Sequence, residues 1–177
     1  MNKKEIIELL QTNHDILIDW LEKQPKEIWE KGPSDKWTTG QHVLHLVNSF
    51  QLLNKALNFP RFFLKHKFGF CNRATRDYDT VVKNYQNKLK GNEDKARKFN
   101  SKLKKPSLKS RKKILRKLSL SNKKLQNKVR RKSDLNLDRL VIPHPLMGKM
   151  TIREIVMWSA YHLEHHTTIL SEKYENL

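Results

Sequence analysis

TIREIVMWSAYHLEHHTTIL, residues 151–170, is the stretch that decides the fold of this chain. Its apolar residues recur at steps of three and four, which is typical of an amphipathic helix with one face turned toward a core. Thr151 is followed three positions later by Glu154, the pattern of a capping box. The sequence therefore predicts a long helix that begins at Thr151 and packs by one face.

Two histidines stand on the apolar face of this helix. His162 and His166 are four residues apart, so their rings project side by side. Each ring has two nitrogens that need partners when they are buried. Two interpretations stay open: each ring bonds to a backbone carbonyl, or both bind one metal ion. His165, about 100° around the helix from His166, is expected at the rim of such a site.

Length and composition favour a single domain over residues 1–177, with few glycines and prolines. The lone cysteine, Cys71, cannot form an internal disulfide, which favours a reducing compartment. The first residues carry no long apolar run, and no segment approaches about 20 apolar residues. We expect neither a signal peptide nor a membrane span, and hence a cytoplasmic protein.

The net charge of +19 comes from one internal stretch. Residues 83–132 hold 21 Lys and Arg against two acidic residues, while the remainder holds 16 basic and 16 acidic residues. Such charge is usually a solvated outer surface, although it can also favour an acidic partner.

Three further segments have the apolar spacing of helices. They are residues 2–23, a segment that starts at Thr38 with a second capping box and ends before Pro60, and residues 107–131. Residues 61–74 are expected to form a loop over a cavity or a short helix, and residues 76–104 a lysine-rich helix or arm. Residues 134–150 are expected to form a connection without a strand. The economical arrangement is all-α: a four-helix bundle with an extra lysine-rich helical segment.

Facing helices of a bundle can combine their side chains around a metal ion. The helix after Thr38 offers His42 or His45, and the last helix offers His162 and His166. Three neutral imidazoles suit zinc or nickel and leave one position open for water or substrate, which is typical of a catalytic site. His14, on the apolar stripe of the first helix, is either a core histidine or part of the same cavity.

Two blocks of sequence resemble a known family. WTTGQHVLHL, residues 37–46, and HPLMGKMTIREI, residues 144–155, running into YHLEHH, resemble the DinB/YfiT-like superfamily. In that family a histidine eight positions after a tryptophan binds metal, and it corresponds to His45. The two ligands of the closing helix correspond to His162 and His166.

The resemblance implies a four-helix bundle, often dimeric, with a divalent metal ion, commonly zinc or nickel. Several relatives are thiol-dependent transferases or isomerases that use glutathione, mycothiol or bacillithiol, and one looks like a metal-dependent hydrolase. A small-molecule substrate and a homodimer are therefore expected here. Residues 83–132 depart from the family pattern; they could steer an anionic thiol or a carboxylated substrate toward the site.

Three functions follow as hypotheses. The first, which we favour, is a metal-dependent enzyme with His45, His162 and His166 as ligands and His14 and His42 as neighbouring helpers. The second is a basic module that binds nucleic acid or another acidic surface, although no nucleic-acid-binding motif is present. The third is a metal-binding bundle without catalysis.

Overall fold

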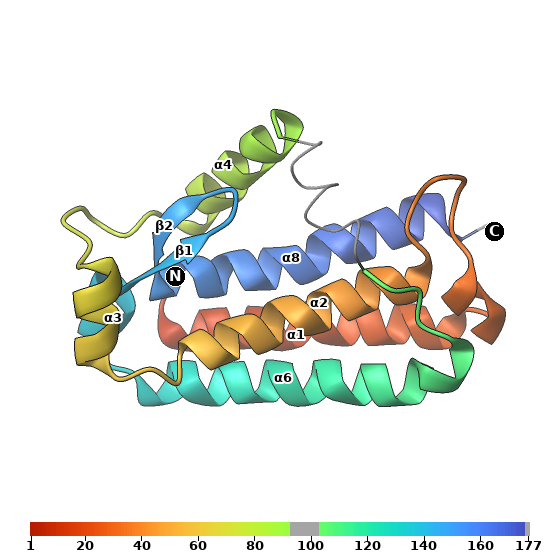
Figure 1. Cartoon of the computed structure of the whole chain (residues 1–177), viewed down its shortest axis with the longest axis horizontal. Helices are drawn as coiled ribbons and strands as arrows, with labels where there is room; N and C mark the ends of the chain where they lie inside the picture. The colour runs from red at the N-terminus through yellow and green to blue at the C-terminus, as the bar shows by residue number, and fades with distance from the viewer. Residues whose placement is uncertain (93–102, 176–177) are drawn as a thin grey trace.

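Four long helices form a bundle in the computed structural model, which describes residues 1–92 and 103–175 (Figure 1). The helices α1 and α8 run in one direction along the bundle, and α2 and α6 run in the other. Their bounds are α1 Lys3–Lys23, α2 Thr39–Ala56, α6 Arg111–Arg131 and α8 Ile152–Lys173. The expectation of an all-α bundle is confirmed.

Capping boxes fix the beginnings of the two helices that carry the histidine pairs. Thr38 and Gln41 exchange side-chain and backbone hydrogen bonds at the start of α2, and Thr151 and Glu154 do the same at α8. Both were predicted from the sequence. A third box, between Asn2 and Glu5, begins α1. Helix α8 continues three residues beyond the predicted stretch, to Lys173.

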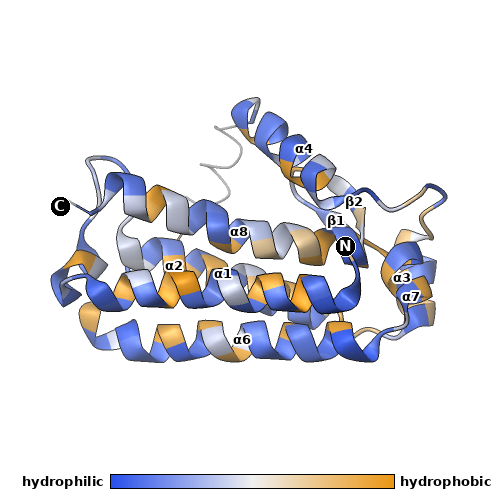
Figure 2. Ribbon diagram, turned by 180° about the vertical axis from the view of Figure 1, so that it is seen from behind, coloured by the Kyte–Doolittle hydropathy of each residue, from blue (hydrophilic) through white to orange (hydrophobic). Residues whose placement is uncertain are grey.

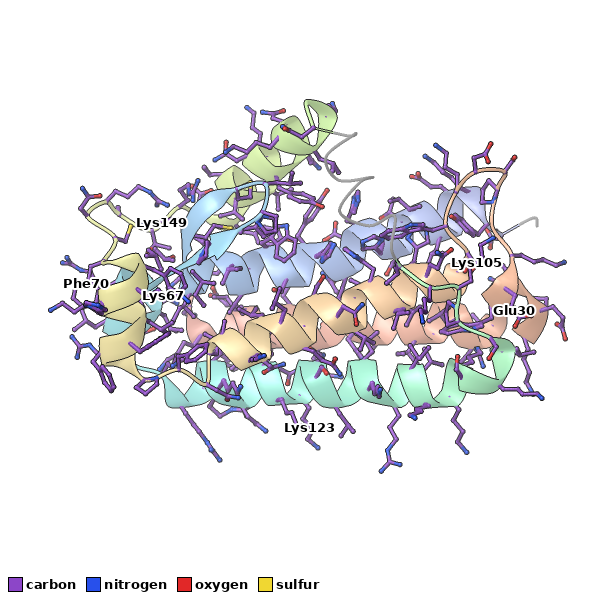
Figure 3. The ribbon with its side chains drawn as sticks, in the orientation of Figure 1. Glu30, Lys67, Phe70, Lys105, Lys123 and Lys149 are labelled. Carbon is purple, nitrogen blue, oxygen red and sulfur yellow. The ribbon has the colours of Figure 1, made fainter. Side chains whose placement is uncertain are left out.

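The core lies between the bundle helices and around α8. Every residue from Ile152 to Leu163 is buried, because α8 packs on α1 and α2 and is also covered by α4 and α7. On α6 the buried apolar residues are Ile114, Leu118, Leu125 and Val129. Hydrophilic and hydrophobic residues alternate along this helix (Figure 2). Lys123 extends from the outer side of α6, away from the other helices (Figure 3).

Shorter elements connect the four helices. In chain order they are η1 (Lys26–Glu30), α3 (Arg61–Phe68), α4 (Tyr78–Lys90), η2 (Leu108–Ser110) and α7 (Asp134–Arg139). Of the two alternatives for residues 61–74, the short helix is the one observed. The lysine-rich segment begins as α4, and residues 93–102 lie outside the part of the chain that is described.

The expectation that residues 134–150 contain no strand was wrong. Strands β1 (Val141–His144) and β2 (Gly148–Thr151) pair antiparallel, with Ile142 opposite Met150. Each strand is too short to show an alternating pattern, and the hairpin depends on a turn in which Gly148 adopts a φ of 71°. The hairpin leads directly into α8 and brings His144 over it.

The first turn of α8 is held by buried charges. The Glu154 carboxylate, which is completely buried, accepts hydrogen bonds from the guanidinium groups of Arg73 and Arg76 at 2.6–3.1 Å. Burial alone would raise the pKa of Glu154, but these bonds outweigh it and lower the pKa to about 2. We call Glu154, Arg73 and Arg76 the carboxylate cluster.

None of the helices in residues 1–92 and 103–175 is long and apolar enough to cross a membrane.

Candidate metal centre

Helices α2 and α8 bring three histidines together. The ring nitrogens of His45, His162 and His166 lie within 4.8 Å of one another. His162 Nε2 lies 3.1 Å from His45 Nε2 and 3.0 Å from His166 Nε2. One turn of α8 separates His162 from His166, and His45 faces them from the second turn of α2. The predicted convergence of these three side chains is therefore present.

The separations of His162 Nε2 from the Nε2 atoms of His45 and His166 are close to those that a metal site requires. In a tetrahedral site with zinc–nitrogen bonds of 2.0–2.1 Å, two ligand nitrogens lie about 3.3 Å apart. The observed separations of 3.0 and 3.1 Å need to expand by only a few tenths of an ångström. Among the described residues no acidic side chain belongs to the group, so its donor set is nitrogen alone.

Burial keeps these rings in the form that binds metal. Desolvation, assisted by the positive charge that neighbouring histidines would carry, places the pKa values of His162 and His166 well below 6.5. Both rings are therefore neutral at pH 7, and no proton has to leave before a metal ion binds. One atom of the group lacks a partner: His162 Nδ1 is buried and has no hydrogen bond among the described residues.

His42 lies directly behind this group. Its Nδ1 is 2.8 Å from His166 Nδ1, and its Nε2 is 3.0 Å from the Tyr174 hydroxyl. His42 is thus in contact with a candidate ligand. Of the two histidines that α2 offers, His45 belongs to the group and His42 contacts it from behind. We call His42, His45, His162 and His166 the imidazole cluster.

A largely apolar cavity of about 390 Å³ adjoins the cluster. Three of the four clustered histidines contribute to its wall, namely His45, His162 and His166. Its lining contains no Lys, Arg, Asp or Glu among the described residues; the other contributors are Trp37, Ser49, Leu52, Leu53, Ala56, Tyr85, Leu89, Ile142, Pro143, His144, Pro145, Leu146, Ile155, Trp158 and His165.

One face of α2 that resembled a core stripe in the sequence is a wall of this cavity. Ser49, Leu52, Leu53 and Ala56 all line it, and Leu52 remains 63% exposed. Trp37 also belongs to the wall: its ring centroid lies 5.1 Å from that of His45.

His144 lines the cavity, a position that the sequence pattern did not predict. Its Nδ1 accepts hydrogen bonds from the backbone amides of Leu146 and Met147, so a neutral ring carries its proton on Nε2. Burial, together with the positive charge of Lys88, lowers the pKa of His144 to about 4. Its ring packs at 4.3 Å on Trp158, which in turn stacks on His162 at 4.4 Å.

Tyr174 was also overlooked, although a signal was present. It follows His162, His166 and Leu170 at further steps of four, so it shares their side of the helix.

The remaining histidines separate into two kinds. His165 lines the cavity without joining the group of ligand atoms, in keeping with the expected rim position. His14 does not line the cavity: its ring nitrogens contact Asp15 and Ser119 at 2.9 and 3.0 Å. The hypothesis that His14 shares the cavity was therefore wrong, because its ring is directed to Ser119 of α6.

A sequence model of the DinB superfamily matches residues 3–170. The chain belongs to the DinB superfamily. No curated protein and no solved structure gives a significant match. The resemblance carried by residues 37–46 and 144–155 is confirmed, and DinB membership together with the three-histidine group fits a metal-binding protein.

Proposed function

We propose that this member of the DinB superfamily is a metal-dependent enzyme that acts on a small, mainly apolar molecule. His45, His162 and His166 would hold one divalent ion, zinc or nickel. The observation that supports this most directly is that His45, His162 and His166 each bring one ring nitrogen to the same point in the wall of an apolar cavity.

A divalent ion bound there would supply Lewis acidity and lower the pKa of a water or thiol in its open position. The chain's own residues would exclude water from the site and hold protons at defined atoms. Trp37, Trp158 and Tyr85 form apolar walls that exclude water from the reacting groups. Burial raises the pKa of Tyr85 to about 12, so its hydroxyl keeps its proton. The Nε2–H of His144 is available to a substrate oxygen, because its Nδ1 is already bonded.

The cavity favours an uncharged substrate. Its wall offers aromatic and aliphatic groups with a few neutral polar atoms, which is typical of small-molecule sites. Thiol-dependent S-transfer and hydrolysis both fit this site, since each needs an activated nucleophile next to an apolar electrophile. Steering of an anionic thiol by residues 83–132 would act outside the cavity, because the described lining holds no lysine or arginine.

The decisive experiment is metal analysis of protein purified without a histidine tag. We expect close to one equivalent of zinc or nickel in the wild type and almost none in His45→Ala, with His14→Ala as the matched control on another helix. Assays with apolar electrophiles, with and without a thiol, then separate transferase from hydrolase activity. Full metal occupancy in His45→Ala would contradict the ligand set, and metal without turnover would favour a non-catalytic bundle.

A second function rests on the outer face of α6. That helix carries ten basic and no acidic residues, and eight of the basic side chains are exposed: Lys112, Lys113, Arg116, Lys117, Lys123, Lys124, Arg130 and Arg131. This surface could bind nucleic acid or another acidic partner. Counterion release predicts that such binding weakens steeply as salt is added. Flat or absent binding at low salt would remove this function.

The homodimer and the cytoplasmic location remain proposals. Sedimentation of the purified chain and fractionation of cells that express it would test them.

A further inference from the structure

A continuous chain of hydrogen bonds lies behind His166. The Tyr174 hydroxyl lies 2.6 Å from the Trp37 carbonyl oxygen and 3.0 Å from His42 Nε2. His42 Nδ1 lies 2.8 Å from His166 Nδ1. His42, His166 and Tyr174 are each at most 6% exposed, so water has little access to these atoms. The polar atoms of three side chains and one carbonyl therefore have to form hydrogen bonds with one another.

The direction of each bond follows from the number of protons available. A carbonyl oxygen only accepts, so the single hydroxyl proton of Tyr174 is donated to Trp37. The Tyr174 oxygen must then accept from His42, whose proton is on Nε2. A neutral imidazole has one N–H, so His42 Nδ1 accepts, and His166 Nδ1 donates to it.

Burial supports the neutral form of His42 on which this direction depends. An imidazolium at this position, which is 6% exposed, would lose its hydration without gaining a carboxylate, since its two ring nitrogens contact Tyr174 and His166. The Tyr174 hydroxyl also stays protonated, since burial raises its pKa to about 12. Each member of the chain therefore has one protonation state at pH 7.

We propose that His42 and Tyr174 are positioning residues that hold His166 in the tautomer with its proton on Nδ1 and a lone pair on Nε2. That Nε2 is the atom 3.0 Å from His162 Nε2, in the centre of the candidate site. The inference rests on the proposed function in one respect: the lone pair matters because Nε2 is the atom that would bind the ion. Partners behind a metal-binding histidine commonly fix its tautomer in this way.

His162, unlike His166, has no hydrogen-bond partner behind its ring among the described residues. Its Nδ1 is buried and makes no hydrogen bond in the described part of the chain, so its hydrogen-bond contacts there are all on Nε2, with His45 and His166. The bonds behind His166 thus distinguish two candidate ligands that lie on the same helix face.

The same bonds also join the beginning of α2 to the end of α8. Trp37 precedes the first residue of α2 by two positions, and Tyr174 follows the last residue of α8. A purely structural link would stabilise the bundle without selecting a tautomer, so the test needs a measurement that reports the ring protons themselves.

The experiment uses the full chain labelled with ¹⁵N-histidine. Long-range ¹H–¹⁵N correlation on the metal-free protein at pH 7 assigns the protonated nitrogen of His166. Zinc affinity is measured separately by competition with a chromophoric chelator. The variants are Tyr174→Phe, His42→Leu and His42→Asn, which keeps an acceptor near the position of Nδ1. The matched control is Tyr161→Phe on α8, whose buried hydroxyl contacts Gln86 and not the cluster.

We expect His166 to carry its proton on Nδ1 in the wild type and in Tyr161→Phe, and to populate both tautomers in Tyr174→Phe and His42→Leu. Zinc affinity should fall about ten- to a hundredfold in these two variants, stay within about twofold in Tyr161→Phe, and recover largely in His42→Asn. A wild-type proton on His166 Nε2 overturns the proposal, as does a Tyr174→Phe variant that matches Tyr161→Phe in both measurements. If the wild type binds no zinc, the proposed function fails, and the tautomer still decides this inference.

Discussion

The first turn of α8 and its third and fourth turns both bury polar side chains, but they satisfy them in opposite ways. In the carboxylate cluster, Glu154 is a buried charge whose two oxygens are matched by Arg73 and Arg76. In the imidazole cluster, His162 and His166 are buried neutral groups whose Nε2 atoms meet without an opposing charge.

The difference teaches how a structural cluster can be told from a binding site on the same helix. A buried ion pair that is complete within the chain stabilises one conformation and needs nothing further. Ring nitrogens that converge with no charge opposite them, such as Nε2 of His162 and His166, fit a group that a ligand completes. Substitutions should therefore affect mainly stability in the carboxylate cluster and mainly metal binding in the imidazole cluster.

The largest effect on stability is expected from Glu154→Ala. The change removes the capping box of α8 and leaves two guanidinium groups without their carboxylate. We expect the free energy of unfolding in urea to fall by about 3 kcal/mol. Glu164→Ala, at an exposed position of the same helix, is the control and should cost less than about 0.5 kcal/mol. Metal bound per folded molecule should not change in either variant. Loss of metal at unchanged stability would reverse the assignment of the two clusters.

Acid should destabilise the metal-free protein in two separate ranges. The folded chain keeps His144 neutral down to a pKa of about 4, whereas the unfolded chain binds that proton near pH 6.5. Stability therefore falls as the pH drops from 6.5 toward 4, by about 3 kcal/mol for this group. The contribution of Glu154 is complete above pH 4.5 and is lost as the pH falls toward its folded pKa of about 2.

Two variants test which residue causes the loss of stability in each pH range. His144→Asn keeps an acceptor for the amides of Leu146 and Met147 but does not titrate, so it should reduce the slope between pH 4 and 6.5. The buried rings of His42, His162 and His166, whose pKa values are also lowered, account for the slope that remains. Glu154→Gln should flatten only the lower range. Urea unfolding across pH in the presence of a chelator measures both. An unchanged slope between pH 4 and 6.5 in His144→Asn would show that other groups cause the first loss.

Metal should stabilise the protein through the imidazole cluster. Zinc at a hundred times its dissociation constant is expected to add about 2.7 kcal/mol to the free energy of unfolding, because it binds the folded chain. The melting temperature should then rise with zinc concentration in the wild type and in Glu154→Gln, but not in His166→Ala. Magnesium is the control ion, since it prefers oxygen ligands. An equal response of His166→Ala to zinc would place the ion elsewhere.

Local sequence patterns predicted the features that residues close in sequence determine, namely helix faces and helix starts. The spacing of His162 and His166 was enough to put both rings on the buried side of α8, and the capping boxes located the starts of α2 and α8. The assignment of His45 came from the motif that follows Trp37. The sequence could not distinguish core residues from cavity residues, because both lie on the same apolar stripe. Leu52 belongs to the stripe of α2, yet it lines the cavity and is 63% exposed.

Contacts between distant segments explain the other omissions. The partner of His42, Tyr174, is 132 residues away, and no period in the sequence joins them. The hairpin that places His144 over α8 consists of two four-residue strands, which are shorter than an alternating pattern needs. The bonds that complete the carboxylate cluster come from Arg73 and Arg76, in the connection before α4.

The smallest effect is expected at Arg153, which also belongs to the first turn of α8. Its guanidinium bonds Asp138 through Nε and Nη2 and Asp134 through Nη2. Asp134 is largely exposed, so water can replace the arginine there. Arg153→Lys keeps the charge but loses the planar pair of donors, and we expect a loss of about 1 kcal/mol in urea unfolding.

Arg153→Met separates charge from packing at this position. Because both aspartates can reach solvent, Arg153→Met should lower the free energy of unfolding little more than Arg153→Lys does. Glu154→Ala should lower it more, because the arginine partners of Glu154 lose a carboxylate that is completely buried. If Arg153→Met instead costs as much as Glu154→Ala, exposure of the partner does not set the strength of these ion pairs. The whole first turn of α8 would then act as one charged unit, and the comparison with the imidazole cluster would have to include Asp134 and Asp138.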